Sequence, residues 1–220
     1  MGQRFSQWYE TRLFDGAMEL FDSDSMRDLR RKVFENLRWE DSTETPKILE
    51  IGVGAGLNLP YYPEWVTELY SASLSPTFPP KAKRRAAERN LTIHHEQSRP
   101  VGLPYSDDTF DFLVATLILC SVDDRAAFVK EVHRVLKPGG KYLFMDHAWH
   151  TSESQTIASR VIAPLHRRVA LGCRIGRTWD EKIYTSSGFR KEDLHVECEN
   201  PKGFSWLVGK VFYGYAKKQQ

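Results

Sequence analysis

Cysteine is scarce in this chain, with 3 among 220 residues. Cys120, Cys173 and Cys198 lie far apart, and no pair has the CxxC spacing of a zinc ribbon or a redox motif. The spacing therefore suggests neither a disulfide framework nor a metal site, and no metal is predicted. Because such cysteine usage is typical of a reducing compartment, we expect a cytoplasmic protein.

An excess of charge and long apolar runs are also missing. The 31 basic and 29 acidic residues give a net charge of +2, which gives no global reason to expect nucleic acid as a partner. The charged N-terminal stretch resembles no signal peptide, and no apolar run is long enough for an integral membrane segment. A hydrophobic fraction of 41% in 220 residues is that of an ordinary globular domain with a full core.

Strand-like and helix-like patterns alternate along most of the chain. Helical spacing covers residues 3 to about 39, and after the polar break "EDSTETP" the short apolar strand "KILEIG" begins. Further strands are predicted in "VTELYSAS", "LTIHHE", "FDFLVATLIL" and "KYLFMDHA", near 192–198 and near 208–216. Helices are predicted in "PPKAKRRAAERN", "DRAAFVKEVHRVL", 152–171 and "TWDEKIYTSSGF", with "KPGG" as a helix stop and turn. This alternation predicts an α/β fold with a mainly parallel, doubly wound sheet.

A glycine-rich turn follows the first strand. Glu50 precedes Gly52, Gly54 and Gly56, so bare backbone stands where a ligand of an open parallel sheet would approach. A helix predicted from near Leu57 would direct its amides to the same place. The spacing G-V-G-A-G does not match the dinucleotide fingerprint, and a turn that needs glycine for steric reasons alone is the alternative.

Several motifs in order carry a family resemblance. "KILEIGVGAGLNLPYYP", the stretch from "LPYSDD" to "FMDHA", and "FYGYAKK" together resemble class I S-adenosylmethionine-dependent methyltransferases, especially small UbiE-like enzymes and the methyltransferase-like thiol methyltransferases of animals. The resemblance implies a Rossmann-like seven-stranded sheet in the order 3-2-1-4-5-7-6, mostly parallel with the last strand antiparallel, and with helices on both faces. It also implies an N-terminal helical cap over the active site at residues 1–45 and a methyltransferase-like domain at 46–220.

The resemblance further implies a binding site for S-adenosylmethionine. In the family, the acid and the glycines of the first turn hold the methionine part of the cofactor, and the end of the fourth strand faces both cofactor and methyl acceptor. The corresponding cofactor-binding residues in this chain are Glu50, Gly52, Gly54, Gly56, Ser73, Leu74, Arg99, Thr116 and Leu117.

Three positions depart from the family pattern. Ser73 stands where the family has the acid that binds the ribose hydroxyls, and Arg99 stands where an aspartate accepts from the adenine amino group. Arg174 replaces a histidine that relatives often have after the Gly-Cys pair. Because hydrogen bonds to a charged group contribute about 1.5–3 kcal/mol each, one such loss weakens cofactor affinity by roughly ten- to a hundredfold. S-adenosylmethionine is therefore the predicted cofactor, and the sequence leaves open that its binding is weakened or absent.

Methyl transfer requires alignment of the acceptor and, for an alcohol or thiol, removal of a proton. His147 is the predicted catalytic base, since it follows an apolar strand and imidazole titrates near neutral pH, and Asp146 is predicted to orient a histidine. A structural role for His147 and an inert buried Cys120 are the alternatives. The predicted substrate-binding residues are Trp8, Tyr9, Cys120, Trp149, His150 and Arg174.

Three functions remain open from the sequence. The first is a methyltransferase acting on a small, fairly apolar thiol, hydroxyl or amine. The second is a protein of the same fold that works without the cofactor, as a natural-product cyclase, isomerase or lyase of secondary metabolism. The third is a catalytically silent homologue that binds a partner or a small molecule. The retained motifs favour the first, and the two lost carboxylates favour the second.

Overall fold

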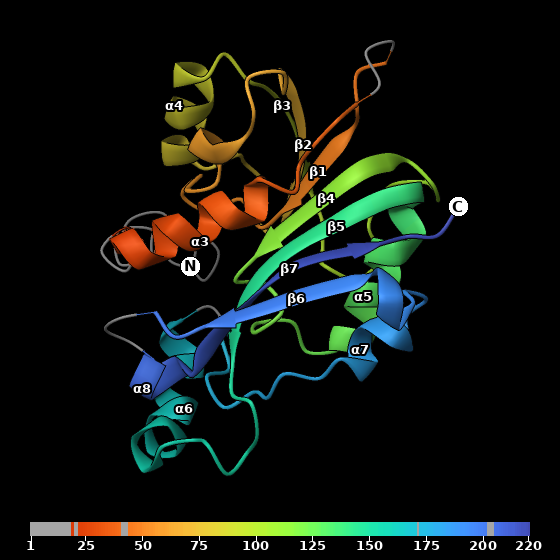
Figure 1. The fold of residues 1–220 in the computed structure, drawn as a ribbon. Helices are drawn as coiled ribbons and strands as arrows, with labels where there is room; N and C mark the ends of the chain where they lie inside the picture. The colour runs from red at the N-terminus through yellow and green to blue at the C-terminus, as the bar shows by residue number, and fades with distance from the viewer. Residues whose placement is uncertain (1–18, 20–21, 41–43, 171, 202–204) are drawn as a thin grey trace.

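A seven-stranded sheet in the order β3-β2-β1-β4-β5-β7-β6 forms the centre of the structure, a computed structural model that describes residues 19, 22–40, 44–170, 172–201 and 205–220 (Figure 1). Strands β1 to β5 are parallel to one another, whereas β7 runs antiparallel to both β5 and β6. The strand order and the antiparallel last strand confirm the prediction. The strands are β1 (Ile48–Ile51), β2 (Glu68–Ser73), β3 (Thr92–Gln97), β4 (Phe110–Thr116), β5 (Leu136–Ala148), β6 (Leu194–Glu199) and β7 (Lys210–Lys217).

Helices cover both faces of the sheet. The central strand β4 is buried on both sides: Leu113 and Ala115 belong to one core cluster, and Phe112 and Val114 belong to the other. Two buried faces explain the near-continuous apolar run of this strand. Helix α5 packs in the first cluster, and α3 and α4 pack in the second. The helices are α3 (Asp24–Phe34), α4 (Pro80–Glu88), α5 (Arg125–Val135), α6 (Ile157–Val169), α7 (Lys182–Thr185) and α8 (Ser205–Val208), with 3-10 turns η2 (Leu59–Tyr61) and η3 (Lys191–Asp193).

The helix predicted from Leu57 is wrong, because only the short 3-10 turn η2 forms there. Two prolines explain this outcome. Pro60 is tolerated only in the first turn of a helix, and Pro63 disfavours helical backbone at Tyr62, which is extended with a ψ of 135°. The glycine turn at residues 52–56 is therefore followed by a compact loop rather than by a helix N-terminus.

The segment "KPGG" stops helix α5, as predicted, but does not form a separate turn. Strand β5 begins directly at Leu136, and its pairing with β4 shifts register between Phe110 and Phe112. Gly139 has a φ of +82°, which glycine adopts without strain. The segment is thus an irregular start of β5.

The described part of the predicted N-terminal cap is helix α3, which packs against β5, β7 and η2. Leu29, Val33 and Phe34 are buried on its inner face. In the described residues, no helix combines the length and the apolar character that crossing a bilayer would require.

Candidate functional site

The glycine turn lies at the edge where the parallel strands end. Gly52, Gly54 and Gly56 have φ values of +74°, +49° and +78°, a backbone region that other residues rarely adopt. A Cβ at Gly52 would lie 2.1 Å from Cδ1 of Ile118, so any side chain at this position would require the Ile118 side chain to move. A Cβ at Gly54 would meet no atom closer than 3.9 Å, so the backbone there faces open space. Gly54 is therefore the point at which a ligand can approach the turn.

Glu50 supports the glycine turn from inside the protein. Its side chain is fully buried, and its two oxygens accept hydrogen bonds of 2.8 Å from Nδ2 of Asn58 and from the hydroxyl of Tyr62. Burial raises the pKa of this carboxyl, although the bonds from Tyr62 and Asn58 and the charge of Arg30 oppose the rise. Both oxygens have protein partners, so the carboxylate holds the turn against η2.

Arg30 joins this network from helix α3, although it was not predicted as a site residue. The guanidinium is buried and donates to Oδ1 of Asn58 at 2.5 Å and to Oδ1 of Asp22 at 3.1 Å. It also reaches Oγ1 of Thr116 at 3.5 Å. A signal was available, because Arg30 shares one helix face with the buried Val33 and Phe34, three and four residues later.

The residues expected at the ribose and adenine follow β2 and β3. Ser73 ends β2, is half-buried, and accepts a 3.3 Å hydrogen bond from the backbone N–H of Ser75. Leu74 is 66% exposed, and Arg99 is exposed beyond the end of β3 at Gln97. The open backbone at Gly54, the Ser73 hydroxyl and the exposed face of Leu74 fit S-adenosylmethionine, with a hydroxyl in place of the usual carboxylate.

An unusual turn ends β4 beside the glycine turn. Oγ1 of Thr116 accepts a 2.9 Å hydrogen bond from Nδ2 of Asn58. Leu117 has a φ of +57°, which is uncommon for a residue with a side chain, and its N–H donates to the carbonyl of Met145 at 2.7 Å. Strained backbone of this kind persists where the surrounding structure fixes it. The turn directs Ile118 against Gly52 and leads to Cys120.

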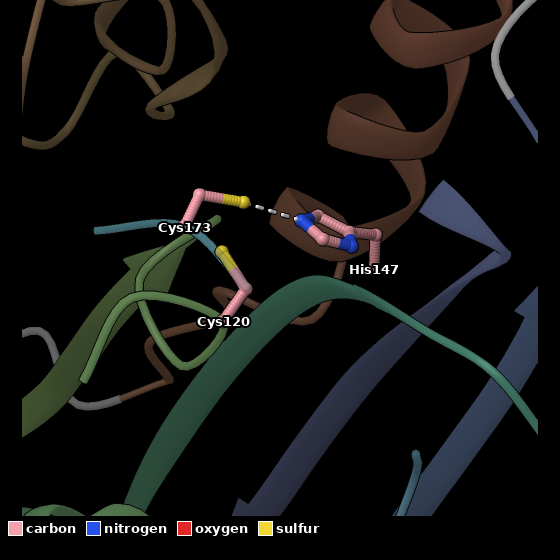
Figure 2. A group of neighbouring side chains, drawn as sticks. All are labelled: Cys120, His147 and Cys173. Carbon is pink, nitrogen blue, oxygen red and sulfur yellow. Dashed lines mark hydrogen bonds between the residues drawn. The ribbon is translucent and has the colours of Figure 1, made fainter. Parts of the chain in front are cut away.

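A cluster of Cys120, His147 and Cys173, called here the Cys-His cluster, lies at the ends of β4 and β5 (Figure 2). Nδ1 of His147 lies 3.2 Å from the carbonyl of Val208, and Nε2 lies 3.0 Å from Sγ of Cys173. The carboxylate of Asp146 accepts from the backbone N–H groups of Cys120 at 3.2 Å and His147 at 3.0 Å. Because a carbonyl only accepts, Nδ1 carries the proton and Nε2 faces the sulfur atoms.

The electrostatics of the Cys-His cluster favour a proton on His147. Burial lowers the pKa of His147, because it disfavours the charged ring. The interactions with Cys120 and Asp146 have a larger effect and raise the pKa of His147 to about 9. A hydrogen bond with Cys173 and burial raise the pKa of the Cys120 thiol. Arg177 lies nearby and donates to the carbonyl of Leu119 at 2.7 Å.

Asp146, predicted to orient a histidine, accepts from two backbone N–H groups, and the His147 ring is held by the Val208 carbonyl instead. The structure thus brings Cys120, Asp146 and His147 together and adds Cys173. Its contribution was not visible in the sequence, because it comes from the loop after α6. That loop is tied to the end of β4 by a 3.1 Å bond from the N–H of Arg174 to the carbonyl of Cys120.

The other predicted substrate-binding residues that the structure describes make their contacts outside the Cys-His cluster. Trp149 is buried and donates to the carbonyl of Ile175 at 2.6 Å, and Arg174 forms an ion pair with Asp123. His150 is exposed, with Nε2 at 3.7 Å from Sγ of Cys198. Trp8 and Tyr9 lie outside the described residues.

Comparisons with known proteins agree on one family. Residues 49–144 match the family described as Methyltransferase domain. Thiol S-methyltransferase TMT1A from Homo sapiens is 30% identical over 208 residues, which cover 89% of this chain and 81% of that protein. Thiol S-methyltransferase TMT1B from Rattus norvegicus is 29% identical over 204 residues, covering 88% and 80%.

A solved structure shows the same fold at lower identity. The YcgJ protein from Bacillus subtilis superposes with a TM-score of 0.68 at 17% identity, covering 88% of this chain and 99% of that one.

Proposed function

Because this chain belongs to the class I S-adenosylmethionine-dependent methyltransferases, a family of enzymes, we propose that it transfers a methyl group from S-adenosylmethionine to the sulfur of a small, fairly apolar thiol. The observation that carries the proposal is the meeting of the glycine turn and the Cys-His cluster at one edge of the sheet, joined by residues 116–120. The choice of a thiol is supported by two relatives, at 29% and 30% identity, that are named thiol S-methyltransferases.

The cofactor is proposed to bind at the edge of the sheet formed by the ends of β1 and β2. The open backbone at Gly54 suits the methionine end of S-adenosylmethionine, and the Ser73 hydroxyl and the exposed Leu74 suit the ribose and adenine. When bound, the cofactor supplies an electrophilic methyl group on a sulfonium. Since Ser73 replaces a carboxylate, we expect binding weaker than is usual for the family.

The methyl acceptor is proposed to bind at the ends of β4 and β5. Leu119 and the Cys120 side chain are buried there, so an acceptor enters apolar surroundings. The acceptor proton goes to Nε2 of His147, the ring nitrogen that the Val208 carbonyl does not occupy, when the ring is neutral, a form that its pKa of about 9 favours in alkaline solution. Asp146 holds the two backbone segments of the cluster in place.

Calorimetric titration with S-adenosylmethionine and S-adenosylhomocysteine tests whether the chain binds the cofactor. Thiophenol, phenol and aniline differ only in the acceptor atom. Mass spectrometry of the products formed from each tests whether the acceptor is a thiol. We expect binding of both cofactor forms and a methylated product from thiophenol above the other two. Absence of binding at millimolar ligand contradicts methyl transfer, and preferred methylation of phenol or aniline contradicts the thiol assignment alone.

A further inference from the structure

Three atoms suited to a thiophilic metal converge in the Cys-His cluster. Sγ of Cys120, Nε2 of His147 and Sγ of Cys173 all lie within 4.8 Å of one another, and the last two are 3.0 Å apart (Figure 2). With Zn–S near 2.3 Å and Zn–N near 2.0 Å, ligand atoms of a tetrahedral zinc site stand about 3.5–3.8 Å apart. The 3.0 Å separation of Nε2 and the Cys173 sulfur is about half an ångström shorter than that spacing, and the other two separations are no more than 4.8 Å, so small side-chain adjustments place all three atoms around one ion.

The surroundings fix these ligands in an orientation that suits a metal. Histidine ligands usually donate their other ring N–H to a carbonyl or a carboxylate, which fixes the tautomer. Nδ1 of His147 has such a partner in the Val208 carbonyl at 3.2 Å. Asp146 accepts hydrogen bonds from the backbone N–H groups of Cys120 and His147. The Arg174 N–H donates to the Cys120 carbonyl and so fixes the loop that carries Cys173. Each ligand is therefore held by a backbone bond on itself or on its neighbour.

The cluster supplies three protein ligands rather than four. Three ligands with an open fourth position are typical of catalytic zinc, whereas structural zinc has four. Cys120 follows Ile118 by two residues, and the Ile118 side chain packs against Gly52 of the glycine turn. The cluster is thus at the edge of the sheet where the cofactor and the acceptor would meet.

We propose that Cys120, His147 and Cys173 bind one Zn²⁺ ion and that its fourth position takes the sulfur of the acceptor thiol. The metal part stands by itself, and the acceptor part rests on the proposed function. On binding, the S–H bond of the acceptor breaks, its proton goes to solvent, and its sulfur coordinates the ion as a thiolate. When the ion binds, the thiols of Cys120 and Cys173 and Nε2 of His147 release their protons to solvent, and two thiolates and a neutral imidazole become the ligands. The ion then takes over the deprotonation of the acceptor that is assigned to His147 in the metal-free protein.

The metal part is tested with the full, untagged chain by elemental analysis and by titration of the metal-free protein with Co²⁺. We expect about one Zn²⁺ per chain, and thiolate-to-cobalt charge-transfer absorption on addition of Co²⁺. The variants Cys120→Ser and Cys173→Ser should weaken Co²⁺ binding by roughly a hundredfold or more, since losing an outer-shell partner alone costs about 10–100-fold. Cys198→Ser is the matched control, because Cys198 also lies near a histidine but outside the cluster. It should bind Co²⁺ like the wild type.

A measurement on the wild type avoids any folding defect of the variants. Added Zn²⁺ should slow the reaction of Cys173 with a thiol reagent and leave the reaction of Cys198 unchanged. Absence of charge-transfer absorption, equal effects of Cys173→Ser and Cys198→Ser, or a Cys120–Cys173 disulfide in the protein as isolated would each overturn the metal site.

The acceptor part is tested by adding thiophenol to the cobalt-loaded protein. A third thiolate should increase the charge-transfer absorption, and an unchanged spectrum would overturn this part while the metal site stands. Titration of the metal-free chain with S-adenosylhomocysteine separates the two proposals. Cofactor binding without metal binding refutes only the zinc site, whereas metal binding without cofactor binding refutes only the proposed methyl transfer.

Discussion

At the scale of single residues, the proposed function predicts that Ser73 limits the affinity for S-adenosylmethionine. Its Oγ accepts from the N–H of Ser75, and an aspartate at this position can accept the same bond while it offers a carboxylate to the ribose. We expect Ser73→Asp to tighten binding of S-adenosylhomocysteine by roughly tenfold to a hundredfold, because hydrogen bonds to a charged group contribute about 1.5–3 kcal/mol. Isothermal calorimetry measures the change.

Ser75→Asp is the matched control for that experiment. It adds the same charge two residues further along, where the hydroxyl of Ser75 donates to the Thr77 carbonyl at 2.8 Å. Affinity should stay within a few-fold of wild type. An equal gain from both variants would show a general charge effect instead of a ribose contact at position 73.

Glu50 gives a second prediction at this scale, through the pH dependence of stability. Its pKa is raised in the folded state above the ordinary 4.5, so the folded protein holds the proton more tightly than the unfolded chain. Stability from this group is therefore present at low pH and is lost as pH rises from about 4.5 through the folded pKa, with a slope of at most about 1.4 kcal/mol per pH unit.

Glu50→Gln removes that titration and keeps the hydrogen bonds, because an amide can accept from Asn58 and donate to the Tyr62 hydroxyl. Urea unfolding across this range should show the wild type losing stability relative to Glu50→Gln as pH rises. The exposed Glu35→Gln should follow the wild type. A difference between wild type and Glu50→Gln that does not vary with pH would refute the predicted titration of Glu50.

How much of the site the sequence predicts depends on where each residue lies. The glycines, Asp146 and His147 follow strands directly, so their convergence at one edge could be predicted from the strand pattern. Cys173 could not, because it reaches the cluster from a loop after α6 that no periodicity positions. Arg30 was missed because a charged residue within a helix is normally assigned to its solvated face.

At the scale of elements, helix α3 is joined to the loop after β1 by a polar contact inside an apolar interface. Arg30 of α3 connects Asp22 to Asn58, and Asn58 in turn bonds Glu50 and Thr116. The helix therefore supports both the glycine turn and the end of β4.

Replacing Arg30 by methionine should break this connection. Methionine fills much of the space but leaves Oδ1 of Asn58 without its donor and removes the buried partner of Asp22, which keeps the exposed Arg27. Removing one partner of a buried pair costs about 3–5 kcal/mol. Arg31→Met is the control, since Arg31 and its partner Asp28 have side chains 61% and 62% exposed. That variant should change the free energy of unfolding by no more than about 0.5 kcal/mol, as denaturant unfolding can measure. Equal effects of the two variants would show that the buried contact contributes nothing.

Elements were predictable where one pattern dominates. The apolar runs of β4 and β5 and the amphipathic α5 formed as expected, because burial on two faces or one face leaves a clear period in the sequence. The helix expected at Leu57 failed because the glycine turn suggested a helix start, whereas Pro60 and Pro63 determine the local backbone. The restriction of backbone angles by the two prolines thus had a larger effect than the helix start that the glycine turn suggested.

At the scale of the whole molecule, the buried core and the ligand-binding edge are separate parts of one sheet. The two core clusters lie on the faces of the sheet, whereas the glycine turn, Ser73 and the Cys-His cluster lie at the ends of strands. A ligand at that edge can therefore stabilise the fold without rearranging its core.

Binding of S-adenosylhomocysteine should raise the melting temperature of the wild-type protein by an amount that its affinity determines. At a concentration about a hundredfold above the dissociation constant, a ligand that binds only the folded state contributes about 2.7 kcal/mol. For a chain of this length that corresponds to a rise of about 5–10 °C. Hydrogen exchange should slow at residues 52–58 and 116–120 and stay unchanged at 106–109, which lie at the opposite ends of the strands. Protection at 106–109 without protection at 52–58 would place the ligand elsewhere and contradict the assigned edge.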